Sequence, residues 1–171
     1  GGVCMINFCG GGETLLPPEM PSYIRAMLEE GHYVMVVTNA TVSRAFDEIS
    51  KFPKELLERL FFKFSYHYME LKQKNLLDRF FGNIHKVVDA GASFTLEATP
   101  SDELLPFIEE MKALAVKEVG AVNHVTVGRD EHDRSIIPIL TKMSPEEYKR
   151  TWSTFKSEFF DYKFSIFSQK R

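Results

Sequence analysis

The fold is decided at Val3-Cys4-Met5-Ile6-Asn7-Phe8-Cys9-Gly10-Gly11-Gly12-Glu13, an apolar run that ends in three glycines and a carboxylate. Residues 3–8 predict a buried β-strand, and the glycines predict a flexible turn at its carboxyl end. Ligands of α/β folds bind at this end of the strands, and glycine lets the backbone approach them closely. We therefore expect Gly11, Gly12 and Glu13 to line a binding site. Glu13 would offer a negative charge to an amine or a metal ion, and we expect it to matter little for folding.

Strand-like and helix-like segments alternate along the chain. The apolar patterns predict helices at 17–30, 41–60 with a break near Pro53, 71–90 and from Ser101 onward, and strands at 3–8, 33–38, 61–66, 93–98 and 124–128. Repeated β-then-α units with short connections predict a parallel sheet. The fold class is therefore α/β, an incomplete parallel (β/α) TIM-like partial barrel with about five to six strands and outer helices.

The C-terminal part of the sequence has a different pattern. A charged loop at 129–134 precedes Ser144-Pro145-Glu146-Glu147, which predicts a capped helix start, and we expect this helix to reach about residue 160. Residues 162–167 predict a further strand. In the helix that begins at Ser101, spacing predicts burial of Leu104, Ile108, Met111 and Ala115. We expect residues 1–128 to form the barrel core and residues 129–171 to form an extension packed on the same domain.

Composition excludes several classes of function. The 171 residues carry a net charge of −3, which does not favour a nucleic-acid-binding surface. No apolar run approaches the ~20 residues that cross a membrane. The two cysteines, Cys4 and Cys9, are five residues apart on one predicted strand, so their side chains point to opposite faces and pair poorly. Reduced cysteines are typical of a cytoplasmic protein.

Polar side chains follow the predicted strands at their carboxyl ends. They include Asn39, Ser65 and His67, while Glu97 lies inside an otherwise apolar strand. In a β/α barrel these positions converge on one mouth, and a buried carboxylate such as Glu97 needs a partner. Polar residues also stop strands and cap helices, and this alternative stays open for Thr38, Asn39 and Thr99.

The order of these strand ends resembles the core of radical S-adenosylmethionine (radical SAM) enzymes. The similar segments are Cys9 to Glu13, Thr38-Asn39-Ala40 and Ser65-Tyr66-His67, which match that family from its second strand onward. The resemblance implies that Gly11, Gly12 and Glu13 bind the amino group of S-adenosylmethionine. It further implies that Ser65 contacts the ribose and that Glu97 lines the adenosine site or substrate cavity. Ala40 stands where the family has a glycine.

The family's three clustered cysteines, which hold a [4Fe–4S] cluster, are absent from this chain. We therefore expect the chain to be a segment of a longer enzyme, with cluster ligands outside it, that is inactive alone. The resemblance implies that the intact protein reduces the cofactor's sulfonium and forms a 5′-deoxyadenosyl radical. That radical would act on a small-molecule or peptide substrate.

Two other classes of function stay open. Glu13, His67 and Glu97 are residue types that suit a divalent metal ion in an aldolase- or isomerase-like barrel enzyme. Alternatively, the chain is a non-catalytic binding domain that retains only the barrel. In either class, a sheet that begins at residues 3–8 has an exposed edge, which invites self-association.

Overall fold

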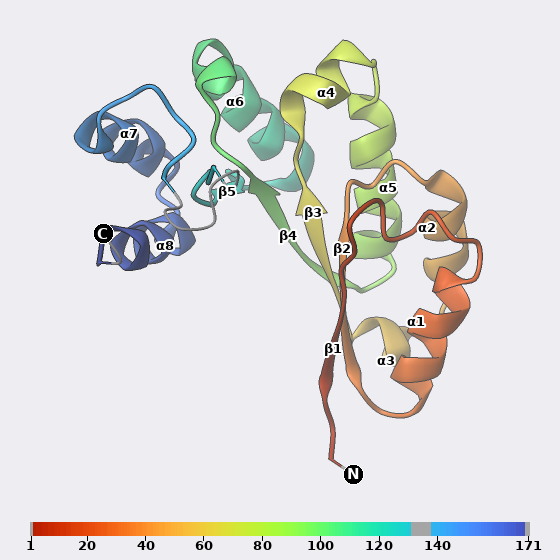
Figure 1. Cartoon of the computed structure of the whole chain (residues 1–171). Coiled ribbons are helices and arrows are strands. Elements are labelled where there is room, and N and C mark those ends of the chain that lie inside the picture. Colours follow the sequence, from red (N-terminus) through yellow and green to blue (C-terminus); the bar gives the residue numbers. More distant parts are fainter. Residues whose placement is uncertain (1, 131–137, 170–171) are drawn as a thin grey trace. The chain divides into compact units, whose positions relative to one another are not determined.

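A computed structural model describes residues 2–130 and 138–169 of the chain (Figure 1). The chain divides into two compact units, residues 1–96 (unit 1) and 97–171 (unit 2). The sheet is parallel, and β4 runs across the boundary between the units. Its strand order follows the chain: β1 (Met5–Phe8), β2 (Tyr33–Thr38), β3 (Leu60–Ser65), β4 (Ser93–Ala98) and β5 (His124–Val125). The predicted α/β class and the parallel β/α arrangement are confirmed.

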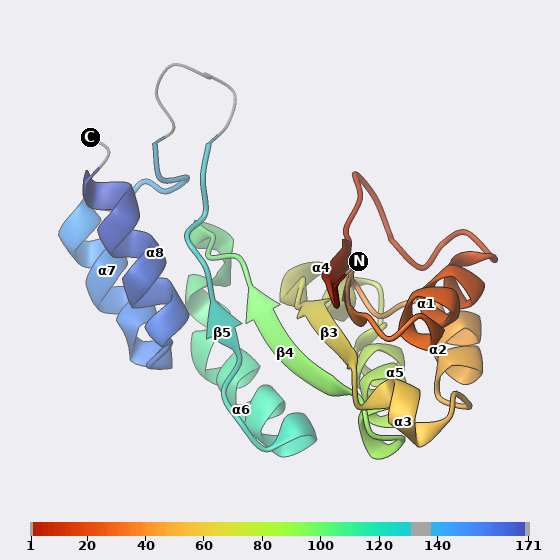
Figure 2. The ribbon, with the colours of Figure 1, turned by 90° about the horizontal axis from the view of Figure 1, so that it is seen from below.

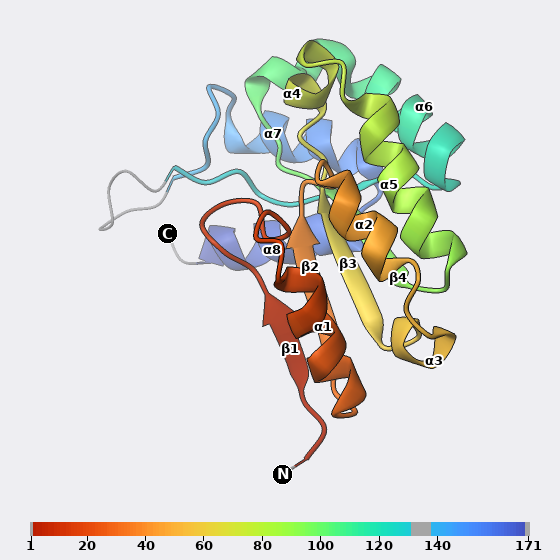
Figure 3. The ribbon, with the colours of Figure 1, turned by 90° about the vertical axis from the view of Figure 1, so that its right-hand side faces the viewer.

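In unit 1 the helices cover one face of the strands (Figures 1 and 3). They are α1 (Met20–Glu29), α2 (Ser43–Ile49), α3 (Lys54–Leu57) and α5 (Leu77–Asp89), while α4 (Tyr68–Gln73) follows the end of β3. The break in the predicted helix at 41–60 falls at Pro53, directly before α3. The predicted helix at 71–90 is split into α4 and α5, with Asn75 at positive φ between them.

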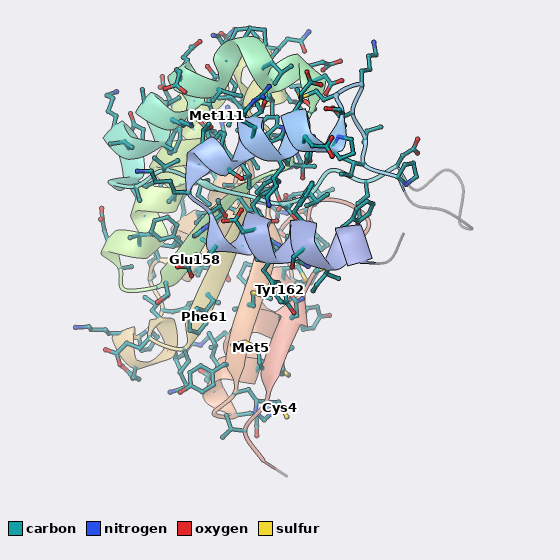
Figure 4. All side chains as sticks on the ribbon, turned by 90° about the vertical axis from the view of Figure 1, so that its left-hand side faces the viewer. Cys4, Met5, Phe61, Met111, Glu158 and Tyr162 are labelled. Atoms are coloured by element: carbon teal, nitrogen blue, oxygen red, sulfur yellow. The ribbon has the colours of Figure 1, made fainter. Side chains whose placement is uncertain are left out.

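Alternation along the strands sorts the side chains of unit 1 into two faces. Phe62 and Phe64 of β3 are buried on the helix-covered face, where their rings stack 5.3 Å apart and contact Phe46 of α2. Met5 and Phe61 lie on the opposite face (Figure 4). This period of two places the apolar core of unit 1 between the sheet and its helices.

The first strand differs from its prediction. The apolar run at residues 3–8 predicts a buried strand, but β1 is the edge strand, and its Met5 and Asn7 are exposed. A continuous apolar run is typical of buried parallel strands, and it does not reveal which strand ends the sheet. Within the described residues, β1 therefore has the expected exposed edge.

Unit 2 forms around its own aromatic core. Its elements are a 3₁₀-helix η1 (Asp102–Phe107), α6 (Ile108–Val119), β5, α7 (Pro145–Trp152), a 3₁₀-helix η2 (Ser153–Phe155) and α8 (Glu158–Gln169) (Figure 2). The predicted burial of Leu104, Ile108, Met111 and Ala115 is confirmed. Of the predicted loop at 129–134, residues 131–134 lie outside the described residues. Among the described helices, none has the length and apolar character needed to cross a membrane.

Two predictions for the end of the chain are wrong. The helix that starts at Ser144 has the predicted capping box, but α7 ends at Trp152, and Lys156 turns the chain at positive φ. Residues 162–167, predicted as a strand, belong to α8. The apolar residues Phe160, Phe164 and Phe167 also recur at the i, i+4, i+7 spacing of a helix, and the rings of Phe160 and Phe164 pack on Tyr148 of α7. Similarly, the fifth strand is shorter than the predicted 124–128.

Tyr148 joins α7 to the segment that follows β5. Its ring is fully buried, and its hydroxyl oxygen accepts a 3.0 Å hydrogen bond from the backbone N–H of Gly128. Gly128 has no space for a side chain, because a Cβ there would lie 2.7 Å from the carbonyl oxygen of Pro100. Burial of the phenol raises the pKa of Tyr148 to about 12, with a smaller contribution of the same sign from the charge of Asp102.

Tyr148 predicts a loss of stability at alkaline pH. The pKa of Tyr148 in the folded state lies above its value near 10 in the unfolded chain. The contribution of Tyr148 to the free energy of unfolding is therefore complete below pH 10 and is lost as pH rises through about 12. At about 1.4 kcal/mol per pKa unit, the free energy of unfolding should fall by roughly 2–3 kcal/mol across this window. Urea unfolding at pH 8 and pH 11.5 measures the change.

Tyr148→Phe should remove this alkaline loss, and it should lower stability at pH 8 because the Gly128 N–H loses its acceptor. Tyr162→Phe, at a side chain 62% exposed, is the matched control and should leave both values as in the parent. Equal alkaline losses in the parent and in Tyr148→Phe would contradict this account.

Candidate functional site

The carboxylate of Glu13 ties the turn after β1 to the end of β2. Its Oε1 accepts hydrogen bonds from Thr38 Oγ1 at 2.6 Å and from the backbone N–H of Leu15 at 3.0 Å. Its Oε2 accepts a 2.8 Å hydrogen bond from the backbone N–H of Asn39. Glu13 is half-buried and Thr38 is buried, so these bonds are partly shielded from water.

These bonds correct the expectation that Glu13 matters little for folding. An ionised carboxylate offers about four acceptor positions, and the protein occupies three of those on Glu13. Hydrogen bonds to a charged group contribute more than neutral ones, about 1.5–3 kcal/mol each. Glu13 is therefore a structural clamp, and any contact it makes with a ligand uses the remaining acceptor position.

The turn after β2 is held by a second set of hydrogen bonds. Thr38 Oγ1 accepts from the backbone N–H of Ala40 at 3.0 Å, and Asn39 Oδ1 accepts from the backbone N–H and the hydroxyl of Thr41 at 3.1 and 2.6 Å. Ala40 has φ +54°, in the left-handed region that glycine adopts more easily. Its carbonyl accepts a 2.9 Å bond from Nδ2 of Asn83, a buried side chain on α5.

The glycine run before Glu13 lies at the surface. Gly10, Gly11 and Gly12 are exposed, and a Cβ built on any of them would meet no atom within 4 Å. None of the three lies at the positive φ seen at Gly31, Gly91 and Gly120. The fold itself therefore does not require glycine at these positions, and their backbone is accessible to a ligand.

The other predicted site residues lie at the carboxyl ends of later strands. Ser65 is the last residue of β3 and is half-buried, and its carbonyl accepts a 3.0 Å hydrogen bond from the N–H of His67. His67 is exposed and precedes α4. Unit 1 thus has Glu13, Asn39, Ser65 and His67 at the carboxyl ends of its parallel strands. The half-buried Glu97 is in unit 2, where it is opposite His124 of β5 in the ladder.

The structure does not support the metal-site alternative. Within residues 2–130 and 138–169, no three His, Cys, Asp or Glu side chains gather as ligands of a metal ion. Of the proposed set of Glu13, His67 and Glu97, Glu13 already accepts hydrogen bonds on both carboxylate oxygens.

Comparison with models of protein families, with curated proteins and with solved structures found no match for this chain.

The strand-end pattern of the sequence does not by itself identify two residues of the site, Thr38 and Asn83. The sequence pattern is compatible with either a site role or a strand-ending role for Thr38, which is the closest hydrogen-bond partner of Glu13. Asn83 follows no predicted strand, but it is a polar residue among the apolar positions Phe80, Ile84 and Val87 of α5. A buried amide needs partners, and this pattern is the signal that could have identified Asn83.

We expect Glu13→Gln to destabilise the protein by about 2 kcal/mol. The amide nitrogen of Gln would replace one of the two carboxylate oxygens. At the Oε1 position it would face the donors of Thr38 and Leu15, and at the Oε2 position the donor of Asn39, so at least one donor loses its acceptor. Urea unfolding at pH 7 measures the change. Glu19→Gln, at an exposed carboxylate on the same connection, is the matched control. Equal stabilities of Glu13→Gln and the parent would contradict the clamp.

Ala40 allows a test of backbone strain. A non-glycine residue at this left-handed φ costs about 1–2 kcal/mol, and Ala40→Gly removes that cost. The loss of a buried methyl, about 0.8 kcal/mol, and the greater freedom of glycine when unfolded, about 0.5–1 kcal/mol, offset the gain. We expect Ala40→Gly to be near neutral. Ala45→Gly, at a buried position of α2, should cost about 2 kcal/mol in the same assay.

Proposed function

We propose that unit 1 binds S-adenosylmethionine at the carboxyl ends of β1, β2 and β3. The observation that carries this proposal is the Glu13 clamp. It joins the turn after β1, which contains three exposed glycines, to the end of the neighbouring parallel strand β2. A turn fixed at one end and open along its backbone is suited to a ligand that needs several hydrogen-bond acceptors close together. The methionine part of S-adenosylmethionine carries such a group, its ammonium.

The residues at these carboxyl ends fit the chemistry of the ligand. Backbone carbonyls of Gly11 and Gly12 and the remaining acceptor position of Glu13 would receive the ammonium N–H groups. Ser65 and His67 offer a hydroxyl and an imidazole to the ribose hydroxyls. In this proposal Asn39 acts through its backbone N–H, since its side-chain oxygen already accepts from Thr41.

The residues do not fit an iron–sulfur cluster. Cys4 and Cys9 are the two thiols of the chain, fewer than such clusters take. The function proposed for this chain is therefore cofactor binding, and we assign no radical step to its residues. A small-molecule or peptide substrate and the rest of the chemistry belong to the proposal for a longer enzyme.

We also propose a cytoplasmic location. Cys4 and Cys9 are exposed free thiols, and a reducing compartment keeps such thiols unpaired.

Calorimetric titration of the full chain with S-adenosylmethionine tests the proposal. Gly12→Val should weaken binding by about ten- to a hundredfold, because a branched side chain blocks access to the turn. Folding should be nearly unchanged, since a Cβ at this position meets no atom within 4 Å. Gly2→Val, at an exposed glycine with equally free surroundings, is the matched control and should bind as the parent does.

Methylthioadenosine, which lacks the amino-acid part, separates the two ends of the ligand. If the glycine turn receives the ammonium, Gly12→Val should leave the affinity for methylthioadenosine unchanged. No binding of S-adenosylmethionine by the parent, or equal affinities of the parent and Gly12→Val, would refute the proposal.

A further inference from the structure

Strand β1 leaves one of its edges unpaired within the described part of the sheet. It pairs in parallel with β2 on one side and is the outermost strand (Figure 3). The carbonyl of Cys4 accepts a 2.9 Å hydrogen bond from the N–H of Tyr33, so the backbone groups of Cys4 point toward β2. Because these directions alternate along a strand, the N–H and C=O groups of Met5 and Asn7 point outward.

This edge lacks the side-chain features that normally prevent pairing. Natural edge strands carry charged residues, prolines or bulges, whereas residues 1–12 contain neither a charged residue nor a proline. The exposed large apolar side chains of unit 1 also come from its first 33 residues: Val3, Met5, Leu16, Tyr23 and Tyr33. Unprotected backbone groups and exposed apolar side chains therefore occur together in the same part of the chain.

We propose that β1 pairs with β1 of a second copy of this chain, antiparallel and about a two-fold axis. The edge is self-complementary, because the outward groups of Met5 and Asn7 can bond to the same groups of the second copy. In each such pairing an odd-numbered residue of one copy lies opposite an odd-numbered residue of the other. The helices of both copies therefore stay on the same face of a continuous sheet. An uncharged strand also places no like charges opposite each other, which favours a second copy as the partner.

The short length of the strand determines the strength of this association. β1 has 4 residues, so the pairing buries less surface than the ~800 Å² per partner of a standard stable interface. We therefore expect a reversible dimer whose population depends on protein concentration.

Sedimentation velocity over a range of concentrations up to about 1 mM tests this proposal. The parent should shift from monomer to dimer. Asn7→Pro should raise the dissociation constant at least about tenfold, because it removes an outward donor and leaves the β1–β2 hydrogen bonds in place. Met5→Lys should act in the same direction through charge repulsion across the axis. Tyr162→Lys, at a comparably exposed residue of unit 2, should dimerise as the parent does.

Crosslinking gives a second readout that does not depend on the strength of association. In a Cys4→Ser/Cys9→Ser background, Met5→Cys combined with Asn7→Cys places thiols at the outward positions of every such register. Opposed residues of a hydrogen-bonded antiparallel pair, as Met5 and Asn7 would form here, are about 5.5 Å apart between Cα atoms, which suits a disulfide. We expect rapid formation of a disulfide-linked dimer, whereas Tyr162→Cys in the same background should crosslink only slowly.

Circular dichroism and thermal unfolding show whether each variant is folded. A parent that stays monomeric throughout would overturn the proposal and would leave the edge to a strand of another source. A dimer that Asn7→Pro and Met5→Lys leave unchanged would also overturn it, because the contact would then lie elsewhere.

Discussion

The carboxylate of Glu13 is the group that holds together the turns at the carboxyl ends of β1 and β2 in unit 1. It accepts from Thr38 and Asn39 at the end of β2, and Thr38 in turn accepts from the N–H of Ala40. The carbonyl of Ala40 continues the series to Asn83 on α5. A single series of hydrogen bonds thus connects the turn after β1, the turn after β2 and a helix that packs on the sheet. Because much of it is buried, the loss of one member leaves others without partners.

This arrangement separates the structural and the binding roles of the site. Side-chain atoms of Glu13, Thr38 and Asn39 are engaged within the protein, whereas the backbone of Gly10, Gly11 and Gly12 is exposed. A ligand at this edge would therefore meet main-chain groups on a turn that is anchored at Glu13. The carboxyl end of this turn is fixed at Glu13 before a ligand binds, whereas its three glycines still have backbone freedom to lose on binding.

How much could be predicted from the sequence depends on the distance over which each signal acts. The apolar periods of β2, β3 and β4, the capping box at Ser144 and the break at Pro53 are local patterns, and each was predicted close to its place. Residues 162–167 show the limit of such patterns, because their spacing fits both a strand and a helix. In the structure this segment is a helix, and its Phe164 packs on Tyr148, a residue outside the segment that the local pattern does not include.

The sequence by itself determined that this chain is a parallel β/α protein with a glycine turn and a carboxylate at the end of its first strand. Those features depend on the order of neighbouring residues, which fixes hydrophobic period and turn chemistry. Only the tertiary structure decided that Glu13 is bound to residues 25 and 26 positions further along, and that β1 is an edge strand. Both depend on which segments lie side by side after folding, and no local pattern of residues records that.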